Sequence, residues 1–310
     1  MVDLILFGDC KETLKQFPRG SAQMCVTSPP YYGLRDYGGE ANQIGQEETP
    51  EEFVNNLVEV FREVRDVLKD DGVLWLNIGD SYYNYRPGTG GLPKQTVSKT
   101  SQDLPTQCNR RANKLDGLKE KDLIGIPWML AFALRADGWY LRQDIIWHKP
   151  NPMPESVKDR CTKSHEYIFL LSKNKKYYYD NEAIKEPVKQ DWGTRDRTKG
   201  KYHNPGTGLA PHSGLSKSYD RKNKRSVWSI TNKPYKGAHF ACFPPDLIEP
   251  CILAGSKKGD IILDPFMGSG TTASMALQHD RHYYGCELHE DYGSLIQKRI
   301  RSVPTKLPML

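Results

Sequence analysis

The 310-residue sequence has no apolar run that approaches the length of a membrane-spanning segment. Residues 2–7 are strand-like, which is not the pattern of a signal peptide. Seven cysteines are present, but no two are spaced as Cys-x-x-Cys, and several lie in apolar runs. We therefore expect a cytoplasmic protein, prokaryotic or phage-encoded, with reduced and buried thiols and no membrane partner.

Apolar residues are also relatively scarce, at 37% of the chain with a mean hydropathy of −0.67. This composition predicts well-packed parts that are interrupted by long polar loops. The length suffices for one large α/β domain with insertions, or for two modest domains.

Positive charge is concentrated in two segments. Residues 185–236 carry 13 lysines and arginines against 4 acids, a net charge of +9, and residues 81–118 carry 6 against 2, a net charge of +4. Because the whole chain has a net charge of +6, the remainder has −7. Basic loops on an acidic body indicate a surface for a polyanion, although each segment alone could be a solvated loop.

One unusual stretch is Thr27-Ser28-Pro29-Pro30-Tyr31, which follows the apolar run Met24-Cys25-Val26. Proline cannot donate to a sheet, so the pair ends a buried strand and holds the backbone extended. Acceptors at Ser28 and Pro29, next to the flat ring of Tyr31, suit the binding of a planar base through its exocyclic amino group. By itself, the motif is equally compatible with a proline turn that is capped by an exposed tyrosine.

The remaining pattern alternates short apolar runs with helical stripes. We expect strands at residues 2–7, 22–27, 73–78, 140–148, 166–172, 260–264 and 282–287, with 140–148 and 166–172 as an antiparallel pair. We expect helices at residues 49–69, 126–136, 244–253, 271–279 and 292–300. Residues 81–118 are rich in Gly, Pro, Lys and Thr, and we expect them to be largely mobile without a ligand. In the second basic segment, aromatic residues alternate with charges and could stack against bases, namely Trp192, Tyr202, Tyr219, Trp228 and Tyr235.

A second chemical motif lies near the other end of the chain. A buried strand at residues 261–264 leads into Gly268-Ser269-Gly270-Thr271-Thr272-Ala273 and then a helix. The glycines allow close approach of a ligand, the helix start offers free N–H groups, and Glu287 ends the next strand, where an acid can hold ribose hydroxyls. A nucleoside-containing cofactor explains this arrangement better than a structural turn does.

The order of the segments limits the choice of cofactor. A nicotinamide-binding half should be followed by further β-α units, yet only 23 residues follow Glu287. The missing strands must then come from the N-terminal half, which would place the Ser-Pro-Pro-Tyr strand next to the Asp264 strand. The expected sheet is a nucleotide-binding sheet with a circularly permuted order of motifs.

With these motifs in family order, the chain resembles amino-directed DNA methyltransferases of the β arrangement. The resemblance covers nearly the whole chain, and it rests on Leu6-Phe7-Gly8-Asp9-Cys10, residues 27–32, Ile146-Trp147-His148-Lys149-Pro150-Asn151, His239-Phe240 with Phe243-Pro244, and residues 263–272. It implies an α/β, Rossmann-like methyltransferase fold with a seven-stranded mixed sheet, one strand of which is antiparallel, and an inserted recognition region. It also implies S-adenosyl-L-methionine as cofactor, a flipped base in double-stranded DNA as substrate, and no metal.

The resemblance assigns roles to individual residues. The catalytic residues it implies are Ser28, Pro29, Pro30 and Tyr31. The cofactor-binding residues it implies are Asp9, Asp264, Phe266, Gly268, Ser269, Gly270, Thr271 and Glu287. Because adenine enzymes of the family usually carry Asp or Asn where this chain has Ser28, the resemblance favours cytosine N4 over adenine N6 as the methyl acceptor.

The expected organisation has three parts. Residues 1–175 form the catalytic half, with the insert at about 81–118; residues 176–238 form the basic target-recognition region; residues 239–310 form the cofactor-binding half. A cognate restriction endonuclease is a candidate partner, and the chain is expected to be a monomer or homodimer. The competing hypotheses are an RNA or protein amino-methyltransferase, a nicotinamide oxidoreductase and a catalytically inactive DNA-binding module.

Overall fold

The computed structural model describes residues 2–33, 43–83, 115, 117–188, 220–232 and 243–304. Most of the first basic insert lies outside these ranges, as do Trp192, Tyr202, Tyr219, Tyr235 and the His239-Phe240 pair. None of the described helices is long and apolar enough to cross a lipid bilayer.

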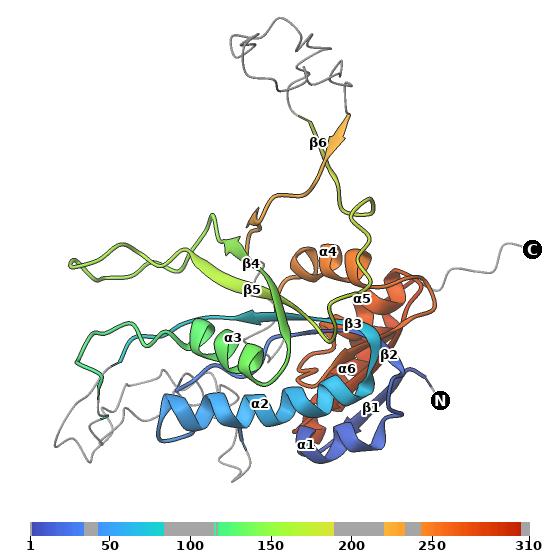
Figure 1. Cartoon of the computed structure of the whole chain (residues 1–310), viewed down its shortest axis with the longest axis horizontal. Coiled ribbons are helices and arrows are strands. Elements are labelled where there is room, and N and C mark those ends of the chain that lie inside the picture. Colours follow the sequence, from blue (N-terminus) through green and yellow to red (C-terminus); the bar gives the residue numbers. More distant parts are fainter. Residues whose placement is uncertain are drawn as a thin grey trace, which may run out of the picture.

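A single large mixed sheet organises the described chain (Figure 1). Its strands, in spatial order, are β1 (Leu4–Phe7), β10 (His282–Glu287), β9 (Ile261–Asp264), β2 (Ala22–Thr27), β3 (Leu68–Ile78), β5 (His165–Ser172), β4 (Tyr140–His148) and β8 (Val227–Ser229). Strand β5 is antiparallel to both of its neighbours, and the other pairings are parallel. The expected antiparallel pair of β4 and β5 is therefore confirmed.

The circular permutation is visible in the pairing of β2 with β9. Met24 pairs with Ile262 and Cys25 with Leu263, although more than 230 positions separate them in sequence. The strand that ends in Ser-Pro-Pro-Tyr and the strand that leads into the glycine loop are thus neighbours at the centre of the sheet, as predicted.

The sheet of the described residues has eight strands, one more than the seven expected. The eighth strand, β8, comes from the basic segment and extends the sheet in parallel beside β4, with Trp147 opposite Trp228. The Trp228 side chain is buried near Trp75, with 6.3 Å between the ring centroids. The prediction that Trp228 faces DNA bases is therefore wrong, because its ring packs against apolar side chains at the edge of the sheet.

Helices cover both faces of the sheet (Figure 1). One face carries α1 (Cys10–Thr13), α2 (Pro50–Val67) and α3 (Ile126–Ala136), and the other carries α4 (Pro245–Gly255), α5 (Thr271–Gln278) and α6 (Gly293–Arg301). In β3, Leu74 and Leu76 pack on the first face while Val73 and Trp75 pack on the second, as the two-residue period of a strand requires.

Helix α2 begins as its sequence predicts. Thr49 and Glu52 form a reciprocal capping box, with Pro50 in the first turn. The helix ends at Val67 rather than at residue 69, and β3 starts directly at Leu68, five residues before the expected strand. Leu68 already pairs with Ala22 of β2, so pairing with the sheet starts before Asp70-Asp71-Gly72, a sequence that is typical of a turn.

The short strands β6 (Glu186–Pro187) and β7 (Arg221–Lys222) pair with each other outside the main sheet. In Figure 1 this two-stranded ribbon projects away from the helices. Single-turn 3₁₀ helices at Leu14–Gln16 and Glu290–Tyr292 complete the described elements.

Candidate active site

The carboxyl ends of the central parallel strands open into one cavity of about 1150 Å³. Ligands of open α/β sheets bind at this edge. The lining includes all the residues that the sequence predicted as site residues except Gly270, namely Asp9, Ser28, Pro29, Pro30, Tyr31, Asp264, Phe266, Gly268, Ser269, Thr271 and Glu287. Two motifs from opposite ends of the chain thus face the same space.

On one side of the cavity, the Ser-Pro-Pro-Tyr motif follows directly after β2. Pro29 is buried, while Ser28, Pro30 and Tyr31 are partly exposed toward the cavity. The preceding Thr27 is fully buried, and its hydroxyl donates a 2.6 Å hydrogen bond to Asp264 Oδ1. The motif therefore starts from a backbone position that is fixed to the neighbouring strand.

The position of the Tyr31 ring depends on the partners of its hydroxyl and on the neighbouring Gly79. Its hydroxyl donates a 2.6 Å hydrogen bond to Glu166 Oε2, and Asn77 Oδ1 lies 3.5 Å away. A Cβ atom added at Gly79 would lie only 2.7 Å from Cε2 of the ring, so the glycine leaves the room that the ring occupies. These contacts determine how the ring is presented to the cavity.

Glu166 is the centre of a small polar network. It accepts hydrogen bonds from Lys149 Nζ and, at 3.3 Å, from Asn77 Nδ2, and it is mostly shielded from solvent together with Lys149. The Lys149 ammonium also lies 4.2 Å from the centroid of the Trp147 ring. Glu166 thus links the hydroxyl of Tyr31 to Lys149 and Asn77.

Asp264 joins three elements at the centre of the site. Its Oδ1 accepts from Thr27 and from the backbone of Phe266 at 3.0 Å, and its Oδ2 accepts a 2.6 Å bond from Thr272 of α5. Only 1% of the residue is exposed, and burial raises the pKa of its carboxyl to about 6 against the opposing effect of these hydrogen bonds. Through these three donors Asp264 ties the glycine loop and α5 to the end of β2, and it also lines the cavity.

The glycine loop between β9 and α5 has the backbone that its composition predicts. Gly268 and Gly270 have φ angles of 55° and 80°, a region that side chains with a Cβ rarely adopt. A Cβ on Gly270 would lie 3.0 Å from the Ile296 side chain, so the second glycine also allows α6 to approach. Gly270 therefore shapes the loop rather than lining the cavity.

Arg299 of α6 is a partner that the sequence did not reveal. Its guanidinium donates to the hydroxyl of Ser269 at 2.8 Å and to the hydroxyl of Thr271. Ser269 and Thr271 were predicted as cofactor-binding residues, and the hydroxyl of each has a hydrogen bond to Arg299. The positive charge of Arg299 lies next to the start of α5, where it adds to the anion-attracting end of the helix.

Glu287 ends β10 at the floor of the cavity. Its Oε2 accepts a 2.7 Å bond from Gly268 N and its Oε1 a 3.1 Å bond from His289 N. Burial raises the pKa of this carboxyl to about 7, and the nearby Asp264 carboxylate acts in the same direction. Each oxygen retains acceptor capacity for a ligand hydroxyl, as the predicted ribose contact requires.

Asp9 stands at the end of β1 beside Glu287. Its Oδ1 accepts a 2.8 Å bond from Lys11 N and so caps α1, while Gly8 N donates to the backbone carbonyl of Glu287 at 2.8 Å. Asp9 lines the same cavity as Glu287, on the side where the resemblance places the cofactor.

This side of the cavity fits S-adenosyl-L-methionine. The loop at Gly268 offers close backbone approach, Glu287 offers an acceptor for ribose hydroxyls, and Phe266 offers an apolar ring at the cavity wall. When bound, this cofactor supplies an electrophilic methyl group on a positively charged sulfonium. The residues around it would bind and orient it, and no side chain of the protein has to form a covalent intermediate.

The sequence did not identify Asn77, Glu166 and Lys163 as cavity residues, and it indicated no role for Lys149. The directions of the strands explain how Glu166 reaches the cavity. Because β5 is antiparallel, its amino end lies at the edge where the parallel strands end, so Glu166 faces Trp147 and reaches the site. Lys163, just before β5, donates to the carbonyl of Asp80 at 2.6 Å, and burial lowers its pKa.

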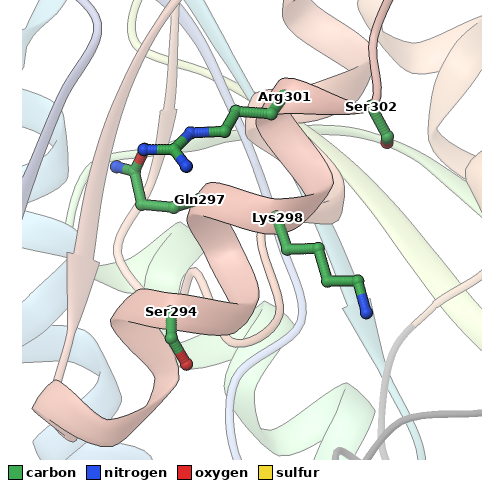
Figure 2. A pocket seen from close by; sticks show the side chains of 5 residues that line it. All are labelled: Ser294, Gln297, Lys298, Arg301 and Ser302. Atoms are coloured by element: carbon green, nitrogen blue, oxygen red, sulfur yellow. The ribbon is translucent and has the colours of Figure 1, made fainter.

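A second, shallower hollow lies on the outer side of α6 (Figure 2). It is lined by Ser294, Gln297, Lys298, Arg301 and Ser302, all from one helix and its end. None of the predicted site residues contributes to it, so it has no part in the arrangement described above.

An α/β sheet with one antiparallel strand, a permuted strand order and a glycine loop facing Ser-Pro-Pro-Tyr defines the class of S-adenosyl-L-methionine-dependent methyltransferases. A family model described as DNA methylase, for N6 and N4 amino-methyltransferases, matches residues 22–298. The chain therefore belongs to this DNA methylase family, and S-adenosyl-L-methionine is its cofactor.

Curated relatives cover almost the whole chain. It is 48% identical over 296 residues to the type II methyltransferase M.SmaI of Serratia marcescens, covering 96% of this chain and 90% of that protein. It is 46% identical over 300 residues to the type II methyltransferase M.Cfr9I of Citrobacter freundii, covering 97% and 88%. The chain is thus a type II DNA methyltransferase of the N4/N6 family.

Solved structures share the fold. The PvuII DNA methyltransferase, described as cytosine-N4-specific, superposes with a TM-score of 0.65 at 18% identity, covering 99% of this chain and 88% of that one. A DNA modification methylase of Thermus thermophilus, in complex with S-adenosyl-L-methionine, superposes with a TM-score of 0.61 at 24% identity, covering 98% and 96%.

Proposed function

We propose that the enzyme transfers a methyl group to the exocyclic N4 amino group of cytosine in a base extruded from double-stranded DNA. The observation that carries this proposal is the single cavity that contains both Ser28–Tyr31 and the Gly268 loop. Ser28 supports cytosine because adenine enzymes usually carry Asp or Asn at this position. The structural neighbour described as cytosine-N4-specific supports the same acceptor.

In this proposal the Ser-Pro-Pro-Tyr residues orient the amino group. The Ser28 hydroxyl and the Pro29 carbonyl accept its two hydrogens, so that the nitrogen lone pair turns toward the methyl group as positive charge develops. Pro30 fixes the loop, and the Tyr31 ring stacks on the extruded base. The Glu166–Lys149 pair holds the tip of that ring, which makes Glu166 a positioning residue.

On the cofactor side, we assign Phe266, Gly268, Ser269 and Thr271 to the methionine part and Glu287 to the ribose. Asp9 is assigned to the adenosine. Asp264 and Gly270 act by shaping the loop, as their contacts with Thr272 and Ile296 indicate.

The acceptor is tested by digesting methylated DNA to nucleosides and separating them by mass. N4-methylcytosine is the expected product. N6-methyladenine without N4-methylcytosine would make the enzyme an adenine methyltransferase of the same family. Transfer of labelled methyl groups to RNA or protein, with none to DNA, would overturn the DNA substrate as well.

We further propose the division into a catalytic half (1–175), a target-recognition region (176–238) and a cofactor-binding half (239–310), in which residues 185–236 read the DNA sequence. Within this segment, Arg225 and Lys222 are paired with Glu186 at 2.6 Å and 3.7 Å, so part of its charge already has a protein partner. Replacing residues 189–219 with those of a relative should change the methylated sequence while cofactor affinity is kept. An unchanged methylome would place recognition elsewhere, with residues 81–118 next.

Two assembly properties belong to the same proposal. A type II methyltransferase protects DNA against a nuclease, so a cognate restriction endonuclease in the same cytoplasm is the expected partner. A monomer or homodimer is the expected form, and sedimentation of the purified enzyme with and without duplex DNA distinguishes the two.

A further inference from the structure

Among the described residues, Met153 is the most exposed large apolar side chain, with 86% of its surface accessible. Single exposed apolar residues are common on protein surfaces, so exposure alone explains nothing. Its location is more informative, because Met153 lies at the cavity that contains Ser28–Tyr31. It belongs to the loop of residues 149–164 between β4 and β5, which in Figure 1 projects well beyond the end of the sheet.

The base of this loop is firmly attached to the protein. Lys149 N donates to Ser164 O at 2.7 Å, which closes the loop at its foot. Asn151 exchanges two hydrogen bonds with the backbone of Asn232, at 3.0 Å and 3.2 Å. Met153 thus extends from an anchored support.

The far arm of the loop is attached as well. The Arg160 guanidinium pairs with Glu155 and lies 3.9 Å from the centroid of the Tyr82 ring. Lys163 Nζ donates to the carbonyl of Asp80.

Two prolines, Pro152 and Pro154, flank Met153 directly. Each restricts its own backbone and that of the preceding residue, so little conformational freedom remains to be lost when this tip contacts a partner. An apolar side chain that is held rigidly and exposed at the mouth of the cavity is suited to insertion into another apolar layer.

The position of the tip indicates which partner supplies that layer. The charge of the loop does not, because Lys149 is paired with Glu166 at the cavity and Arg160 is paired with Glu155. Met153 borders the cavity that holds Ser28–Tyr31, which the proposed function assigns to an extruded base, so the apolar layer next to the tip is the stack of base pairs that this base leaves.

We propose that Met153 inserts between the base pairs at the target site and fills the space that the extruded base leaves. The proposal rests on the proposed function, because it presumes that a base leaves the duplex to reach Ser28. An apolar wedge contacts the unpaired partner base and its neighbours, which lowers the free energy of the extruded state relative to the stacked state. Met153 then acts on base extrusion and leaves the chemistry of methyl transfer untouched.

The test compares Met153→Ala, Met153→Leu and, as a matched control, Val157→Ala. Val157 lies on the same loop and is 39% exposed, but it is not part of the cavity lining. Each purified enzyme is mixed with S-adenosyl-L-methionine carrying a labelled methyl group. The substrates are two duplex oligonucleotides that contain the sequence found by methylome sequencing, one fully paired and one mismatched opposite the target base. Single-turnover transfer rates and cofactor affinities are measured.

A mismatch lowers the free-energy cost of base extrusion, so it should compensate for the loss of the Met153 side chain. Met153→Ala should slow transfer to the paired duplex about tenfold or more, and to the mismatched duplex less than about threefold. Met153→Leu should restore most of the rate on the paired duplex, and Val157→Ala should match the wild type on both. Cofactor affinity should be unchanged throughout.

Equal losses for Met153→Ala on the two duplexes, or no loss on either, would overturn the wedge. Failure of the underlying function has a different signature, because the wild-type enzyme would then transfer no methyl group to either duplex. The two failures are therefore distinguishable within the same set of reactions.

Discussion

The two sides of the cavity differ in how deeply their functional groups are buried in the protein. On the cofactor side, Asp264 and Glu287 are buried and accept hydrogen bonds from the protein, and Arg299 holds Ser269 and Thr271. On the acceptor side, Ser28 and Tyr31 are partly exposed, and Met153 is almost fully exposed. The cofactor half is thus buried and organised in advance, whereas the acceptor half is open to a substrate, which under the proposed function is a base that has left its stack.

This difference predicts that substitutions on the two sides affect cofactor affinity and turnover differently. The largest effect should come from Gly268→Val, which should abolish cofactor binding. A branched side chain would enter the ligand's approach and would also be strained at a φ of 55°. Equilibrium titration with S-adenosyl-L-methionine measures the loss.

Gly20→Val is the matched control for Gly268→Val. Gly20 has a similar φ of 65° with no atom within 4 Å of an added Cβ, so it introduces the strain without touching the cavity. Cofactor affinity should survive in Gly20→Val. Equal loss in both variants would mean that backbone strain alone, and not the ligand site, explains the effect of Gly268→Val.

The second effect in size should be that of Ser28→Ala on turnover. Removing an acceptor that is aimed at the developing charge typically costs about 100-fold or more in kcat. Cofactor affinity should stay within about threefold of the wild type, because the protein-bound groups on the other side are unchanged. If Ser28→Ala weakened cofactor binding as strongly as it slowed turnover, the separation between the two sides would be wrong.

A smaller effect should follow from Tyr31→Phe, which keeps the stacking ring and removes the hydroxyl that donates to Glu166. The loss of one hydrogen bond to a charged acceptor is worth about 1.5 kcal/mol, or roughly tenfold in kcat if ring orientation matters. Tyr31→Ala should cost more, because it also removes the ring. Steady-state kinetics on duplex DNA checks both, and a kcat of Tyr31→Phe equal to that of the wild type would leave Glu166 without a positioning role.

The smallest effect should be the pH dependence of cofactor affinity through Glu287. Its pKa is raised to about 7, so the ionised acceptor form is lost as the pH falls below that value and is gained as the pH rises. Affinity should therefore decrease below about pH 7, by at most tenfold per pH unit, and level off above it. Titrations of cofactor binding from about pH 5.5 to 8.5 measure this profile. Glu287→Gln should flatten it. An unchanged slope in that variant would assign the pH dependence to another group, such as Asp264.

Much of the architecture follows from local patterns in the sequence. The capping signal at Thr49 and the strand-loop-helix pattern from Ile261 to Thr272 each occur where local chemistry predicts them. The adjacency of β2 and β9 followed from the shortage of strands after Glu287. These features depend on residues that are close in sequence or on the order of the motifs.

The features that were missed depend on residues that are far apart in sequence. Glu166 reaches Tyr31 only because β5 reverses direction between β3 and β4, and Trp228 is buried only because β8 joins the sheet edge. The role of Arg299 at the glycine loop likewise depends on how α6 packs against α5. Side-chain types alone cannot indicate such partners, because many surface lysines, arginines and tryptophans have the same local surroundings.

The attachment of β8 to the sheet has a practical consequence for exchanging specificity between relatives. Trp228 is part of the packed interior and Asn232 anchors the loop that carries Met153, so residues 227–232 belong mechanically to the catalytic body. The natural junctions for a graft are therefore the paired strands β6 and β7, where incoming and outgoing chain lie side by side. A donor segment inserted between them would leave the host's sheet edge intact, whereas a longer graft would have to supply a matching tryptophan and asparagine of its own.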